Sequence, residues 1–200
     1  MKQITYFLAV IFGALLFISC TLNQKSERNN ISSTSLPDSV YAIQAERLVA
    51  LTFDTLRNSL QEAIRARSLD GAIGFCNERA SGITSIYADS VTIRRTALRF
   101  RSQTNKPDSL EMVVLMEMEA VLQSGNVALP KIVRTQVPNE VHFFKPIIMQ
   151  PMCVNCHGKP LKEINQLTMS SIQALYPDDR AVNFNTGDLR GVWHVVYKER

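Results

Sequence analysis

The feature that most constrains this chain is a pair of cysteines two residues apart with a histidine directly behind them, Cys153-Val154-Asn155-Cys156-His157. A C-x-x-C-H run is the attachment signature of a c-type haem. The two cysteines form thioether bonds to one haem, and the adjacent histidine becomes an axial ligand of its iron. The sequence therefore predicts one covalently bound haem c, held by Cys153 and Cys156, with His157 on the iron.

Other uses of closely spaced cysteines are a disulfide or thioredoxin-like redox pair, and half of a zinc site. A zinc site needs two more ligands, and the remaining cysteines and histidines form no second spaced pair. A thioredoxin-type pair belongs near the start of a βαβ unit, whereas this pair follows Pro146 and Pro151 late in the chain. Both observations favour haem.

The N-terminus predicts the compartment. Lys2 precedes a nearly unbroken apolar run, Ile4–Ile18, which is shorter than the roughly 20 residues of a membrane span and fits a secretory signal. A small residue followed by Cys20 resembles the cleavage site of bacterial lipoproteins. Residues 1–19 are therefore predicted to be a lipoprotein signal peptide and Cys20 to carry lipid, with a plain signal peptide or an uncleaved anchor as alternatives. The protein is expected outside the cytoplasm, lipid-anchored to the periplasmic face of a bacterial outer membrane.

The rest of the chain predicts a tether and one domain. Residues 20–38 are polar with almost no periodicity, which is typical of a flexible tether, and residues 39–200 are expected to form the haem-binding domain. The formal net charge of +4 comes from basic residues that are spread along the chain. No nucleic-acid partner is therefore expected.

Apolar periodicity predicts an α+β domain. A long helix is expected over residues 40–67, with an apolar stripe of Val49, Phe53, Leu56, Leu60 and Ile64. Leu69-Asp70-Gly71 predicts a turn, and a second helix follows with its stripe from Ala72 to Tyr87. The other expected elements are a strand in 91–100, a helix over 110–123, antiparallel strands within 127–145, a short helix over 170–176 and a strand over 189–197. Helices first and strands later favour an antiparallel sheet.

Counting cysteines isolates Cys76. Lipid accounts for Cys20 and haem for Cys153 and Cys156, which leaves Cys76 as the fourth cysteine, on the inward face of the second predicted helix. An unpaired thiol in an oxidising compartment is either buried or reactive. Cys76 is therefore a candidate for the second axial ligand, with an inert buried thiol as the alternative.

Other residues compete for that second axial position. His142 and His194 lie in predicted strands and are within reach of the far face of the haem, although such histidines are more often exposed or satisfied in the core. Met149 and Met152 lie beside the attachment motif on the proximal side and are poorly placed to reach the opposite face.

An arginine-dense stretch supplies candidate partners for the haem carboxylates. A haem carries two propionates, and forked guanidinium donors suit carboxylates. Arg95 and Arg101 are the first candidates, and Tyr176 offers an additional hydroxyl donor. The alternative is that each arginine lies at the edge of a strand with its side chain in solvent.

Several separated blocks between about residues 41 and 197 carry a family resemblance. They are Ala72-Ile73-Gly74-Phe75-Cys76; Arg95-Thr96 with Arg101, Asn105, Pro107, Asp108 and Glu111; Phe143–Ile147 leading into Cys153–Pro160; Tyr176–Ala181; and Gly187–Gly191. Together they resemble the bacterial family of PAS-like c-type haem domains, found as extracytoplasmic haem sensors. The chain departs from the family pattern at Ser102-Gln103, Leu110 and Val182-Asn183.

The resemblance implies a PAS-like fold, in which an antiparallel sheet and long N-terminal helices surround one c-type haem. It also implies Cys76 as the distal iron ligand. Thiolate ligation favours ferric iron, and reduction weakens the bond. Release of Cys76 would then open a site for a small gas or let its helix move.

These features predict a membrane-tethered, mono-haem c-type cytochrome that senses redox state or a small ligand. No output domain is recognised in the sequence, so the sensor is expected to need a signalling or redox partner protein. The alternative is a periplasmic carrier of single electrons. Enzymatic activity such as a peroxidase reaction is not expected, because the sequence offers no identifiable distal acid–base constellation.

Overall fold

The computed structural model describes residues 36–84 and 90–199. The predicted signal peptide, Cys20, nearly all of the predicted tether and Tyr87 lie outside these residues. Among the described helices, none is long and apolar enough to span a membrane.

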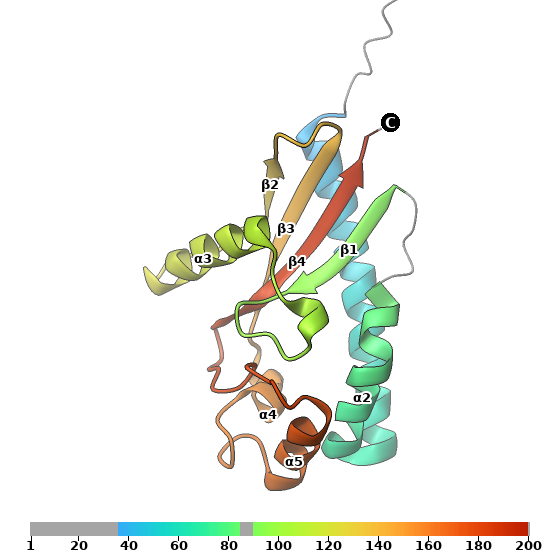
Figure 1. Ribbon diagram of the computed structural model, residues 1–200, viewed down its shortest axis with the longest axis vertical. Coiled ribbons are helices and arrows are strands. Elements are labelled where there is room, and N and C mark those ends of the chain that lie inside the picture. Colours follow the sequence, from blue (N-terminus) through green and yellow to red (C-terminus); the bar gives the residue numbers. More distant parts are fainter. Residues whose placement is uncertain (1–35, 85–89, 200) are drawn as a thin grey trace, which may run out of the picture. The chain divides into compact units, whose positions relative to one another are not determined.

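A four-stranded antiparallel sheet organises the described residues (Figure 1). Its strands are β1 (Val91–Thr96), β2 (Lys131–Arg134), β3 (Glu140–Ile148) and β4 (Leu189–Lys198). Their order in the sheet is β1-β4-β3-β2, so the last strand of the chain pairs with the first. The expected α+β architecture with an antiparallel sheet is confirmed.

Successive side chains of a strand point to opposite faces of the sheet, and the two faces pack against different helices. On one face Phe143, Trp193 and Val195 pack against the long helix α2. On the other face Phe144 and Val192 pack against α3. The sheet is therefore covered by helices on both sides, which explains why β4 is mostly buried and why β3 is buried from Val141 to Phe144.

Helix α2 (Asp38–Thr84) is broken at Ser68, whose φ of 65° and ψ of 179° are not helical. The chain reverses there and the second half returns beside the first (Figure 1), so that Leu56 and Ala80 share one apolar cluster. Two helices were expected here, but the predicted turn at Leu69-Asp70-Gly71 is wrong because these residues are helical.

The residues of the predicted apolar stripe in the first half of α2 are buried or half-buried, except Phe53, which is 45% exposed. Its ring lies under the guanidinium of Arg57, at 5.7 Å from the ring centroid. A long arginine stem covers such a ring at the surface, so the position suits an aromatic residue without facing the core.

Helix α3 (Ser109–Gln123) begins with a reciprocal cap. The Asp108 carboxylate accepts from the backbone N–H of Glu111, and the Glu111 carboxylate accepts from the N–H of Asp108. This capping box satisfies two otherwise unpaired donors of the first turn. It also fixes the Glu111 side chain against the sheet, where that side chain is buried.

The stretch between β3 and β4 contains only short helical elements and lies at the end of the sheet where β3 ends and β4 begins (Figure 1). It contains a 3₁₀ turn (Pro151–Cys153), α4 (Val154–His157) and α5 (Gln166–Leu175), which is longer than the predicted helix. A second 3₁₀ turn, Gln103–Asn105, follows β1, which ends at Thr96 instead of Phe100.

Candidate functional site

The predicted attachment motif lies in a short helical turn. Cys153 ends the 3₁₀ turn, and Cys156 and His157 lie on α4. Both cysteines are partly buried free thiols. A single helical turn places a C-x-x-C pair on neighbouring positions of one face, which is the arrangement that two thioether bonds to one macrocycle require.

His157 is held in one orientation by the chain that precedes β4. Its Nδ1–H donates to the backbone carbonyl of Ala181 at 2.8 Å, and its ring meets the Phe184 ring edge-on. Burial, with Arg190 and Arg101 nearby, holds the pKa of His157 well below its usual range. The imidazole is therefore neutral, and its Nε2 keeps a lone pair that is free to bind a metal.

Arg101 anchors the same segment. Its Nη2 donates to the carbonyls of Cys156 at 2.6 Å and Ala181 at 3.2 Å, and the guanidinium pairs with both carboxylate oxygens of Asp179. This ion pair is nearly buried, with side-chain exposures of 10% and 6%. A buried bidentate pair is geometrically specific. Arg101 therefore fixes the position of the attachment turn relative to residues 179–181, which precede β4.

Cys76 lies on the second half of α2, which packs against α5 through Ile73. It is close enough to Arg95 and Arg101 for their charges to lower its thiol pKa, although burial has the larger, opposite effect and the net pKa is raised. Burial also raises the pKa of Cys156, Arg101 lowers it, and the charge of Cys76 adds to the rise. The structure thus brings the isolated cysteine next to the attachment motif, although the two are far apart in the sequence.

Tyr176 belongs to the same group. Burial, followed by the charge of Cys76, raises the pKa of its hydroxyl to about 12. Its ring lies 5.9 Å from the guanidinium of Arg101. Tyr176 therefore carries a neutral hydroxyl close to Arg101, and its role as a donor to the haem stays a prediction.

Two arginines of this region have buried nitrogens without partners among the described residues. They are Nε of Arg95 and Nε of Arg190. Arg95 stacks over Trp193 at 5.6 Å, and Arg190 lies over Phe184 at 5.4 Å. Burial and the charges of Arg101 and Arg95 lower the pKa of Arg190 to about 9.

These two guanidiniums, each with an unpaired buried Nε, test whether the residues fit a haem. A buried charge without a counter-ion is costly, and Asp179 is already engaged by Arg101. The region therefore has an excess of positive charge that one or two carboxylates would neutralise. Haem propionates meet this need, so the residues fit the group that the cysteine motif predicts.

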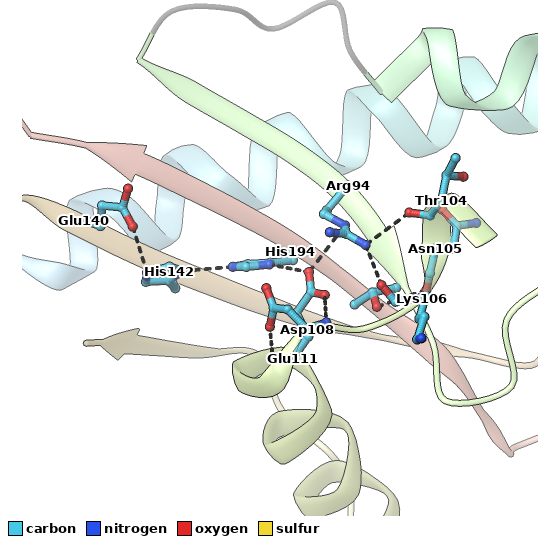
Figure 2. Close-up of polar contacts among 10 residues, drawn as sticks. Arg94, Thr104, Asn105, Lys106, Asp108, Glu111, Glu140, His142 and His194 are labelled. Atoms are coloured by element: carbon cyan, nitrogen blue, oxygen red, sulfur yellow. Dashed lines mark hydrogen bonds and ion pairs between the residues drawn. The ribbon is translucent and has the colours of Figure 1, made fainter. Parts of the chain in front are cut away.

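The histidines considered as alternative iron ligands lie elsewhere. His142 and His194 belong to the sheet face that is covered by α3, and they form a buried chain with Glu111 (Figure 2). Met149 is buried in a small cluster with Phe184, and Met152 is exposed. Met149 packs with Cys153 and Val154 of the attachment motif itself. Of the candidates that come from other parts of the chain, Cys76 is the one whose helix packs with the motif, since Ile73 and Cys156 share an apolar cluster.

Three functional residues were not among the predicted site residues: Asp179 and Arg190 in this region, and Glu111 on the α3-covered face of the sheet. The Asp179 carboxylate both pairs with Arg101 and accepts from the Ala181 N–H. All three lie in the blocks of the family resemblance, which was a usable signal, although Glu111 also reads as an ordinary helix-capping glutamate.

Comparison with known proteins gives a family and a fold. No curated protein matches the chain. The solved crystal structure of the cyanobacterial haem protein Tll0287 aligns with a TM-score of 0.56 and 21% identity, over 83% of this chain and 98% of that chain. A likeness at this identity establishes the shared fold. The Tll0287-like family model matches residues 39–197, so the chain belongs to the Tll0287-like family.

Proposed function

We propose that this protein is a mono-haem c-type cytochrome that senses redox state or a small ligand. Cys153 and Cys156 hold the haem covalently, and His157 and Cys76 supply its axial ligands. The observation that carries the proposal is that the half of α2 bearing Cys76 packs with the attachment turn, since Ile73 and Cys156 share an apolar cluster. That the solved relative is a haem protein supports the choice of cofactor.

The two proposed iron ligands have different roles: His157 stays in place, and Cys76 exchanges. His157 is fixed by its bond to the Ala181 carbonyl, and that carbonyl is also held by Arg101. Ligands tied down in this way do not exchange readily. Haem, when bound, supplies a one-electron redox centre with one exchangeable axial position.

Cys76 is suited to be the exchangeable ligand. Burial raises the pKa of its thiol, whereas Arg95 and Arg101 favour the thiolate. These opposed effects leave the sulfur able to donate as a thiolate and to take up a proton when it is released. Because α2 reverses at Ser68, Cys76 lies on a separate helical arm, whose movement would signal the release.

The cellular setting is also a proposal. The lipoprotein-type N-terminus supports a lipid anchor at Cys20 and a location on the periplasmic face of the outer membrane. The sensor would act on a signalling or redox partner protein in that compartment.

Absorption spectra of the ferric and ferrous haem-loaded protein, with and without carbon monoxide, test the proposal. We expect a low-spin, thiolate-type ferric spectrum and carbon monoxide binding after reduction. Cys76→Ala should abolish the thiolate signature. Gly74→Ala is the matched control, since a Cβ there meets nothing within 4 Å.

Two outcomes would contradict the proposal. A wild-type spectrum in Cys76→Ala would remove Cys76 from the iron. A protein that stays six-coordinate in both oxidation states and ignores carbon monoxide would instead be the single-electron carrier.

A further inference from the structure

A chain of buried polar side chains crosses the α3-covered face of the sheet (Figure 2). His142 Nδ1 and His194 Nε2 are 3.0 Å apart, and His194 Nδ1 is 2.7 Å from Glu111 Oε1. One end of the chain is Glu140, whose carboxylate lies 3.6 Å from His142 Nε2. The other end is Arg94, whose Nε lies 3.4 Å from the same Glu111 Oε1.

The middle of this chain is shielded from water. Glu111 is 0% exposed, His194 4% and His142 8%. A buried carboxylate needs a counter-charge and hydrogen bonds, and here Arg94 and the backbone N–H of Asp108 provide them. His194, Arg94 and Asp108 together lower the pKa of Glu111 although burial raises it. Glu111 is therefore ionised.

Counting protons along the chain shows that it is one proton short. An ionised Glu111 only accepts, so His194 donates from Nδ1. If both rings are neutral, His194 Nε2 must accept from His142 Nδ1–H, and His142 Nε2 is left as a bare lone pair facing the Glu140 carboxylate. That atom is indeed buried without a hydrogen-bond partner among the described residues. One added proton turns every contact of the chain into a donor–acceptor pair.

We propose that His142 and His194 together form a binding site for a single proton, entered beside Glu140, and that its occupancy is transmitted to the segment that carries His157. The first part stands on the geometry of the pair alone. The second part rests on the proposed function, because its consequence is felt at the haem.

The charges around the pair set the range in which the proton binds. Burial and His194 lower the pKa of His142, while Glu140, Asp108 and Glu111 oppose this effect. On β2, which pairs with β3, Lys131 is engaged by Glu117 of α3. The proton therefore binds below about pH 6.5, the ordinary value for histidine.

Proton binding changes what holds Arg94. His194 and Arg94 both contact Oε1 of Glu111. With the added proton, the histidine pair carries a positive charge beside Oε1 of Glu111, which weakens the attraction of that oxygen for Arg94. The guanidinium also donates from Nη2 to the carbonyls of Thr104 at 3.1 Å and Lys106 at 2.8 Å. Arg94 thus ties the proton site to the loop between β1 and α3.

The same loop reaches the attachment segment. Arg101, within it, donates to the carbonyls of Cys156 and Ala181, and the Ala181 carbonyl also accepts from His157. Unbroken hydrogen bonds and backbone therefore connect Arg94 with the proposed proximal ligand. Contiguous packed networks of this kind carry coupling between sites.

A metal ion is a poorer occupant of the same cluster. Ligand atoms of Asp108, Glu111 and His194 lie within 4.8 Å of one another, which is close enough for a cation. However, Arg94 already places a positive charge on Glu111, and the Asp108 carboxylate caps α3. The proton needs no displacement of either.

Nuclear magnetic resonance of the imidazole nitrogens in the reduced, haem-loaded protein tests the proton site. The chain has three histidines, so each ring can be assigned. We expect His142 and His194 to take up one proton jointly below about pH 6.5. Glu140→Gln should weaken this uptake by about two- to fivefold, as expected for a partly exposed pair, while Glu117→Gln, which removes a carboxylate from the same side of the sheet, should not.

Reduction potentials across the same pH range test the transmission. The wild-type potential should rise as the proton binds, since added positive charge favours the reduced iron, and His142→Phe should flatten that rise.

Two independent one-proton titrations, or equal shifts in Glu140→Gln and Glu117→Gln, would overturn the proton site. A joint titration with a flat wild-type potential would overturn the transmission. A protein without haem would refute the proposed function, while the imidazole titration would still decide on the proton site.

Discussion

At the scale of single residues, the arginines show what sequence can and cannot assign. Arg95 and Arg101 were chosen because guanidiniums suit carboxylates, and the structure places both near Cys76. Arg101 nevertheless donates to Asp179 and to two backbone carbonyls, whereas Arg95 and Arg190 each have one buried nitrogen without a partner among the described residues. Which guanidinium is left unsatisfied depends on the packed surroundings, and local sequence does not contain them.

We therefore predict that Arg190→Gln lowers the reduction potential of the haem-loaded protein. Removing a buried positive charge near the iron should favour the oxidised state by on the order of 1–2 kcal/mol. Arg180→Gln is the control, because Arg180 is an exposed arginine of the same region that lies over Phe100. Redox titration of the two variants checks this, and equal potentials would place Arg190 away from the haem.

At the scale of elements, the helix hairpin of α2 is the instructive case. Periodicity predicted both helical halves, and the Asp-Gly pair predicted the reversal at the wrong place. Gly71 serves another purpose, since a Cβ there would lie 2.6 Å from Cβ of Arg67. The reversal falls on Ser68, which no turn signal in the sequence marks. The Ser68 hydroxyl donates to the carboxylate of Asp70.

Ser68→Gly should stabilise the protein by about 1 kcal/mol, because the backbone angles of Ser68 lie in a region that favours glycine. Ser59→Gly, a serine in the regular part of the same helix, should destabilise it by about 0.5 kcal/mol. Urea unfolding of both variants measures the difference. A loss of stability in Ser68→Gly comparable to that in Ser59→Gly would show that the reversal does not strain the chain.

At the scale of the whole described chain, the order of elements and the antiparallel character of the sheet were predictable from the periodicity of apolar residues and from turn-forming residues. The strand order was not, because β4 inserts between β1 and β3 only through long-range pairing. That same pairing brings Arg94, His194 and His142 to one face of the sheet. Cysteine counting isolated Cys76 before any fold was known, and its role as an iron ligand stays a prediction.

Acid stability follows from the buried chain. The pKa values of His142 and Glu111 are both lowered on folding, so the unfolded protein binds more protons and the free energy of unfolding rises with pH. Stability should be greatest above about pH 6.5 and should fall in two steps, first through the pKa of His142 and then below the ordinary carboxyl value of 4.5 through that of Glu111.

Denaturant titrations at a series of pH values measure this profile. Glu111→Gln should remove the more acidic step and destabilise the protein at pH 7 by about 1 kcal/mol, since Arg94, which is 41% exposed, loses its ion-pair partner. A stability that does not change between pH 7.5 and pH 4 would contradict the ionisation states described for this cluster.

The most direct test of the central claim is the intact mass of the denatured protein, produced in a host that attaches c-type haem. We predict the mass of the polypeptide plus one haem for the wild type and for Cys76→Ser, and the bare polypeptide mass when Cys153 and Cys156 are both changed to serine. A wild-type mass without haem, obtained while a known c-type cytochrome is matured in the same host, would contradict covalent attachment at Cys153 and Cys156.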